Sequence, residues 1–89
     1  MGLSIASPPG EIIPRIRSAV EGAIPGASVD VTGSGTHFEI RVVSEAFEGK
    51  RTLARQRMVL QSIAHLMSGD NPPVHAIDKL ETIVPEPAA

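Results

Sequence analysis

The pattern of apolar and polar residues changes from a two-residue period to a helical period in the middle of the chain. From His37 to Val43 polar and apolar residues alternate, which is typical of a strand with one buried face. From Thr52 to Met67 apolar residues recur every three or four positions, which predicts an amphipathic helix. The expected core face of this helix carries Leu53, Met58, Val59, Ile63, Leu66 and Met67.

A short link, residues 44–50, joins this strand to this helix. Ser44 is expected to cap a single helical turn, because a serine oxygen can accept a hydrogen bond from a backbone amide at a helix start. Gly49 is expected at a positive φ, which glycine adopts without steric cost. The link is therefore predicted to turn tightly.

An earlier segment predicts a second helix. Its apolar positions fall at helical spacing up to Pro25-Gly26, and they are Ile13, Ile16, Val20, Ala23 and Ile24. Pro14 is compatible with this helix in the first turn, where its missing amide hydrogen has no intrahelical partner. The residues Pro8-Pro9-Gly10 mark the expected start of this helix.

Two further segments predict strands. Ser28 to Thr32 alternates, with Val29 and Val31 facing inward, and Gly33-Ser34-Gly35 is expected to be a flexible hairpin loop of three to five residues. Val74 to Val84 is predicted to be extended. Ile77 is expected on one face of that strand, with Ala76 and Leu80 on the other.

The order of elements is helix, strand, strand, short turn, helix, strand. This order predicts an α+β domain in which helices cover one face of a three-stranded mixed sheet. The last strand–helix–strand unit should form a right-handed crossover between parallel strands. We expect the domain at residues 11–85, with a flexible lead-in at residues 1–10 and a tail at residues 86–89.

Composition narrows the possible functions. The 89 residues carry a net charge of -2 and only two aromatic residues, both phenylalanine, which argues against a wholly basic nucleic-acid-binding surface. Without cysteine the chain forms no disulfide and offers no thiolate to an iron–sulfur cluster. Neither an apolar run of membrane-spanning length nor a secretory leader is present, so we expect a soluble cytoplasmic protein with no membrane partner.

The histidines suggest a site at one edge of the sheet. His37 opens one predicted strand and His75 opens its parallel neighbour, so both should emerge at the same edge, about 4.8 Å apart in backbone position. The glycine loop at residues 33–35 should leave space there for a ligand or a partner. Two imidazoles suit zinc, copper or iron but make an incomplete site, and a plain surface role is the alternative. His65 is expected to be structural or exposed.

Basic residues cluster where the long helix begins. They are Lys50, Arg51, Arg55 and Arg57. Such a cluster can bind phosphate, a carboxylate or an acidic partner, and it can equally be a solvated helix start. No nucleophile elbow, P-loop or dinucleotide fingerprint is present, so we do not expect an enzyme.

Four segments together resemble the BolA-like protein family in order and spacing. They are residues 36–44, 47–50, 55–59 and 74–77, within a resemblance that extends from about Ile12 to Pro85. The hairpin at residues 31–38 is similar to the shorter-loop bacterial branch of the family. The resemblance implies an α+β fold similar to the type II KH domain.

The resemblance also implies a non-enzymatic adaptor in iron–sulfur cluster trafficking and iron regulation. Members pair with monothiol glutaredoxins and share a [2Fe-2S] cluster with them. His75 matches the family's cluster ligand, and His37 is the candidate for the second ligand. The partner's cysteine and its glutathione would supply the thiolates, so no cofactor is expected in the isolated chain, which would be a monomer or a weak homodimer. Arg51, Arg55 and Arg57 would contribute to partner docking.

An alternative within the same resemblance is a DNA-binding transcriptional regulator linked to the stress response. Lys50, Arg51, Arg55 and Arg57 would then contact DNA. The chain departs from the family pattern at Gln56, where a histidine is usual, and at Leu60, where a tyrosine is common. The residues after Thr82 lack the family's tryptophan, so the resemblance gives no support for a final helix.

Overall fold

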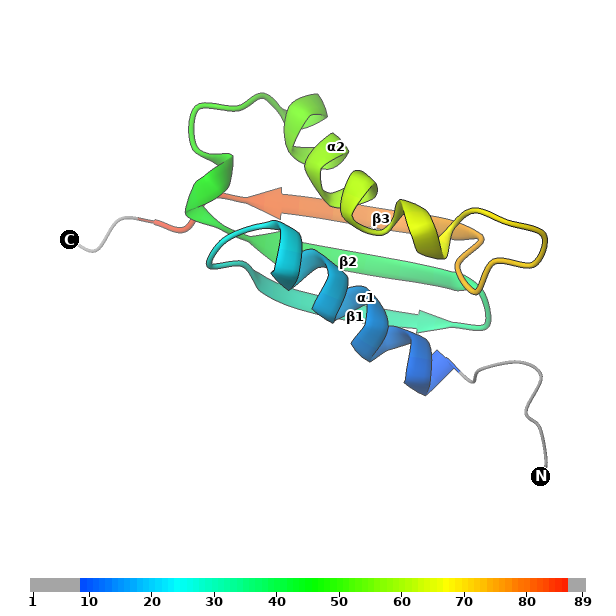
Figure 1. Cartoon of the computed structure of the whole chain (residues 1–89). Coiled ribbons are helices and arrows are strands. Elements are labelled where there is room, and N and C mark those ends of the chain that lie inside the picture. The colour runs from blue at the N-terminus through cyan, green and yellow to red at the C-terminus, as the bar shows by residue number, and fades with distance from the viewer. Residues whose placement is uncertain (1–8, 87–89) are drawn as a thin grey trace.

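The structure is a computed structural model of the chain, and it describes residues 9–86 (Figure 1). The elements in chain order are α1 (Pro9–Ala23), β1 (Ser28–Ser34), β2 (His37–Val43), the 3₁₀ turn η1 (Glu45–Phe47), α2 (Thr52–Ser62), the 3₁₀ turn η2 (Ala64–Leu66) and β3 (Ala76–Ile83). The predicted α+β class and element order are confirmed. Helix α1 begins two residues before the expected domain start, and the rest of the expected lead-in and residues 87–89 of the tail lie outside the described residues.

The sheet has the strand order β1-β2-β3. Strands β1 and β2 are antiparallel, with Ser34 opposite His37, and β2 and β3 are parallel, with His37 opposite Ala76. Helices α1 and α2 lie on the same face of this sheet (Figure 1). The predicted mixed sheet with helices on one side is therefore confirmed, including the parallel pair. None of the helices in residues 9–86 has the length and apolar character needed to cross a membrane.

The core between helices and sheet is mostly aliphatic. Helix α1 and the residue after it supply four buried side chains at four-residue spacing, which are Ile12, Ile16, Val20 and Ile24. The predicted face of α1 was partly wrong, because Ile13 is only half-buried and Ala23 is exposed. The helix begins at Pro9, within the predicted start at residues 8–10, but Pro14 is its sixth residue and lies beyond the first turn in which it was expected.

The hairpin between β1 and β2 is tighter than predicted. Gly33 and Ser34 belong to β1, and the turn consists of Gly35 and Thr36, with Gly35 at a φ of 63°. A Cβ atom on Gly33 would lie 2.3 Å from Cδ1 of Phe38, which is fully buried. The space left by Gly33 therefore holds the Phe38 ring and not a ligand.

A bulge in β3 changes the predicted faces of that strand. Phe38 is paired with Ile77, but Glu39 is paired with Lys79, so Asp78 is an extra residue. Ile77 and Leu80 both pack against the core, although they were predicted on opposite faces. Two core residues three positions apart can share a face only because the bulge shifts the alternation by one residue. The ladder itself covers Ala76–Ile83, shorter than the predicted Val74–Val84.

Helix α2 is shorter and less buried than its sequence pattern predicts. It ends at Ser62 instead of Met67, and η2 follows. Val59 is its only buried residue, and Leu53, predicted on the core face, is 58% exposed. The link before it is as predicted: the Ser44 side chain accepts a hydrogen bond from the Ala46 amide and caps η1, and Gly49 has a φ of 79°.

Candidate functional site

His37 and His75 lie at the edge of the sheet where β2 and β3 both begin. The carbonyl oxygen of Thr36 accepts hydrogen bonds from the backbone amides of His75 at 2.9 Å and Ala76 at 3.3 Å. His37 stands opposite Ala76 in the parallel ladder, and both histidines are exposed. The expected meeting of the two residues at one edge is therefore present, while their role as ligands stays a prediction. We call this region the histidine edge, made of His37, His75 and Asp78.

Asp78 is the residue of the histidine edge that the sequence did not predict. Its Oδ1 lies 3.1 Å from Nδ1 of His37, and the two side chains are 52% and 59% exposed. A carboxylate only accepts hydrogen bonds, so Nδ1 of His37 carries the hydrogen in this pair. The lone pair of the neutral ring is then on Nε2, the nitrogen that does not face Asp78. Asp78 lies two residues after Ala76, the ladder partner of His37, so it falls on the same face of the sheet.

The donor atoms at this edge fit part of a metal or cluster site. Within residues 9–86 no group of three or more histidine and carboxylate side chains is placed to hold a metal ion. Two accessible imidazoles can supply two ligands and leave the other positions to an outside donor. This chemistry suits a shared [2Fe-2S] cluster, in which imidazoles take the place of two thiolates.

The glycine loop contributes less open space to this edge than predicted. The space beside Gly33 is filled by Phe38, whereas a Cβ atom at Gly35 would meet nothing within 4 Å. The open part of the hairpin is therefore its tip, at Gly35 and Thr36.

The basic residues lie at the other end of the β2-α2-β3 unit. Helix α2 follows β2 and η1 in the chain and runs back toward the start of β3 (Figure 1). Its 11 residues cover about 16 Å at the usual rise per residue. Lys50 and Arg51 precede its first turn, so the structure does not bring them together with the histidine edge. We call this region the basic end, made of Lys50, Arg51, Arg55 and Arg57.

The members of the basic end differ in how free their side chains are. Lys50, Arg51 and Arg57 are exposed, whereas Arg55 is half-buried. The Nε of Arg55 donates a hydrogen bond of 2.8 Å to the carbonyl oxygen of Lys50. Arg55 therefore secures the start of α2, and the three exposed cations are the ones that can meet a partner.

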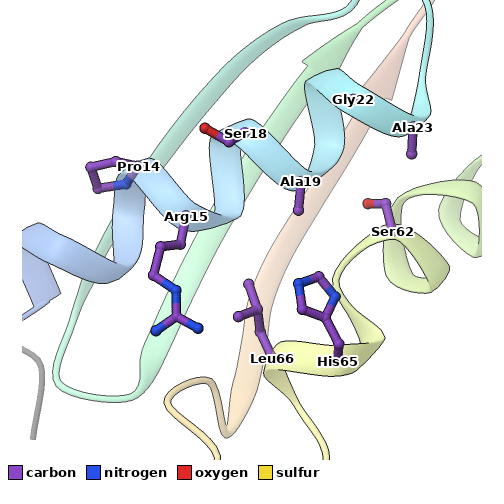
Figure 2. A pocket seen from close by; sticks show the side chains of 9 residues that line it. All are labelled: Pro14, Arg15, Ser18, Ala19, Gly22, Ala23, Ser62, His65 and Leu66. Atoms are coloured by element: carbon purple, nitrogen blue, oxygen red, sulfur yellow. The ribbon is translucent and has the colours of Figure 1, made fainter.

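A shallow groove of about 590 Å³ lies between α1 and the α2–η2 segment (Figure 2). Arg15 and His65 extend toward it from opposite sides, and α1 lines it with the small residues Ala19 and Gly22. His65 is exposed, which agrees with the expectation that it is structural or exposed. The groove was not predicted, because it depends on how two helices pack and not on the pattern of either one.

Comparison with known proteins agrees with the fold and the motifs. Residues 17–86 match the family described as BolA-like protein. The uncharacterized protein in the rpoN-murA intergenic region of Acinetobacter guillouiae is 34% identical over 64 residues, which are 71% of this chain and 74% of that protein. Protein BOLA2 of Arabidopsis thaliana is 39% identical over 59 residues, which are 65% of this chain and 59% of that protein.

Solved structures give the same result. A bolA protein homologue from Coxiella burnetii superposes with a TM-score of 0.65 at 32% identity, covering 79% of this chain and 86% of the other. The match to the family spans most of this chain, from the middle of α1 through all three strands. The protein described here therefore belongs to the BolA-like family.

Proposed function

We propose that this protein is a non-enzymatic adaptor in iron–sulfur cluster trafficking and iron regulation. In this proposal it binds a monothiol glutaredoxin, and the two proteins share a [2Fe-2S] cluster. The observation that carries the proposal is the histidine edge. There His37, the first residue of β2, and His75, the residue before β3, are both exposed and have neighbouring backbones. Family membership supports the proposal, since the resemblance of the sequence to this family implies a complex with a monothiol glutaredoxin.

His75 and His37 are the residues that would hold the cluster on this side. His75 follows the buried Val74, and its amide is bonded to the carbonyl of Thr36, so its backbone is fixed while its ring faces solvent. His37 has one ring nitrogen engaged with Asp78 and the other free. When bound, the cluster would supply a one-electron centre whose potential is raised by imidazole ligands relative to thiolates. The partner and its glutathione would supply the sulfur donors.

Reconstitution of the complex tests this proposal. The chain is mixed with a monothiol glutaredoxin, glutathione, iron and sulfide without oxygen, and the product is followed by native mass spectrometry and visible circular dichroism. We expect a one-to-one heterodimer whose spectrum differs from that of the glutaredoxin homodimer. His75→Ala should remove that spectrum, because one imidazole ligand is lost.

His65→Ala is the matched control, since His65 is also exposed but lies on η2 by the helix groove. It should leave the heterodimer spectrum as in the wild-type protein. An unchanged spectrum for His75→Ala would overturn the ligand assignment. Failure of the wild-type chain to form any cluster-bridged heterodimer would overturn the proposed function itself.

The second candidate, a DNA-binding regulator, is favoured by one observation only. Three exposed cations gather at the basic end, away from the histidine edge, and binding of a cluster does not explain them. Fluorescence anisotropy with duplex DNA over a range of salt concentrations separates the two proposals. The adaptor proposal predicts no duplex binding near physiological salt. Salt-dependent binding that is lost in Arg57→Ala would support the DNA-binding role instead.

A further inference from the structure

Asp78 lies at the bulge in β3, on the same solvent face of the sheet as His37. Ile77 packs against the core and Lys79 is paired with Glu39 on the solvent face, so Asp78 and Lys79 are neighbouring residues that are both exposed. Asp78 stands between the ladder levels of Phe38 and Glu39, two residues after Ala76, which is paired with His37. Its side chain therefore lies on the same face of the sheet as that of His37. From there it reaches the His37 ring.

We infer that Asp78 is a positioning residue for His37, which holds the imidazole so that Nε2 alone is available to a metal. The 3.1 Å contact between Oδ1 and Nδ1 fixes both the tautomer and the orientation of the ring. A carboxylate bonded to the far nitrogen of a metal-binding histidine also makes the ring a stronger donor. The inference rests on the proposed function, because it concerns His37 as a cluster ligand.

An ordinary surface ion pair is the competing explanation of the same contact. Both side chains are more than half exposed, and exposed pairs contribute little to stability. A stability measurement therefore cannot separate the two explanations. The tautomer of His37 and the retention of the cluster can separate them, because both should change on substitution of Asp78 only if Asp78 is a positioning residue.

The first measurement uses the isolated chain and needs no cluster. Nitrogen-15 chemical shifts of the His37 ring, recorded at a pH where the ring is neutral, report which nitrogen carries the hydrogen. We expect the Nδ1–H form to dominate in the wild-type protein and the Nε2–H form, which free imidazoles favour, to dominate in Asp78→Ala. Glu81→Ala is the matched control, since Glu81 is an exposed carboxylate on the same strand that lies 3.9 Å from Arg41.

The second measurement uses the heterodimer with a monothiol glutaredoxin. The half-life of the cluster absorbance in the presence of an iron chelator is expected to fall about tenfold in Asp78→Ala, the usual scale for such partners of metal-binding histidines. Glu81→Ala should keep the wild-type half-life. The half-life measured for His37→Ala gives the lower limit, which is expected when the ligand itself is lost.

The outcomes distinguish this inference from the proposed function. An unchanged tautomer in Asp78→Ala, or an unchanged half-life in a heterodimer that His37→Ala destabilises, would overturn the positioning role and leave the adaptor proposal intact. A cluster half-life that is unchanged in the His37→Ala heterodimer would overturn the inference, because His37 would then not be a ligand. A wild-type chain that forms no cluster-bridged complex would overturn both.

Discussion

The two ends of the β2-α2-β3 unit carry the two sets of candidate functional residues, and they are built differently. At the histidine edge, the start of β2 is joined to the start of β3 by ladder pairing, and Phe38 directly beneath is fully buried. At the basic end, α2 contributes one buried residue, Val59, and presents Leu53 and Arg57 to solvent. The histidine edge is thus held by the core, whereas the basic end rests on a lightly packed helix.

The difference teaches that nearness in sequence is a poor guide to a shared site in this fold. The basic end is closer to His37 in sequence than His75 is, yet the crossover carries it away from the edge where the histidines meet. Parallel strands bring their starting ends together whatever the length between them. A partner seated on the histidine edge would have to extend along the whole of α2 to reach Lys50 and Arg51.

The comparison predicts that the largest loss of stability follows a change beneath the histidine edge. Phe38→Ala should lower the free energy of unfolding by about 3–5 kcal/mol, because it removes a fully buried ring from the core. Urea denaturation followed by circular dichroism measures this loss. Leu53→Ala at the start of α2 should change stability by less than about 0.5 kcal/mol, since that side chain is 58% exposed. Equal losses would contradict the contrast between the two ends.

A smaller loss is expected at the hairpin. Gly33→Ala should destabilise the protein by about 1–3 kcal/mol, because its new methyl group would overlap the Phe38 ring and the backbone oxygen of His37 and force them to shift. Gly22→Ala is the control in the same type of substitution. It lies in α1 with nothing within 4 Å of the new atom, so it should stabilise by about 0.5–1 kcal/mol. Thermal unfolding of the two variants should shift in opposite directions.

The link between β2 and α2 has an anchor at Ser44 whose removal should lower stability. The Ser44 hydroxyl, which is buried, donates to the carbonyl of Pro25 at 2.9 Å and accepts from the amide of Ala46 at 3.0 Å. Ser44→Ala should therefore cost about 1–2 kcal/mol in urea denaturation. Ser68→Ala, which removes an exposed hydroxyl bonded to one carbonyl, should cost less than about 0.5 kcal/mol. An unchanged free energy of unfolding in Ser44→Ala would mean that η1 does not depend on its cap.

The smallest effect is expected from reversing charge at the basic end. The double variant Arg51→Glu, Arg57→Glu should unfold within about 0.5 kcal/mol of the wild-type protein, because both side chains are exposed. Its heterodimer with a glutaredoxin should keep the wild-type cluster spectrum. A changed spectrum would show that the two ends act as one surface. A weaker complex at low salt with an unchanged spectrum would assign the arginines to docking alone.

The sequence predicted the parts of the fold that depend on local chemistry. Alternation places Phe38 and its neighbours correctly, because a strand with one buried face has a strict two-residue period. Ser44 and Gly49 have the roles expected of a capping serine and a glycine with positive φ. The approach of His75 to His37 followed from a general rule of chain topology, not from any contact between their side chains.

What the sequence did not predict depends on packing between elements. The tight turn needs Gly33 inside the strand, because its missing side chain makes room for the Phe38 ring. Leu53 fits the helical period of α2, but it is 58% exposed and stands outside the core, which α2 joins only from Met58 onward. Asp78 was not predicted as a partner of His37, because the contact depends on the register between β2 and β3, which places Asp78 on the face that carries His37.

A single oxygen atom ties the two histidine-bearing strands together. The carbonyl of Thr36, at the tip of the hairpin, receives the amide hydrogens of both His75 and Ala76. The same peptide group leads directly into His37, so a shift of this carbonyl would displace the backbones of both histidines together.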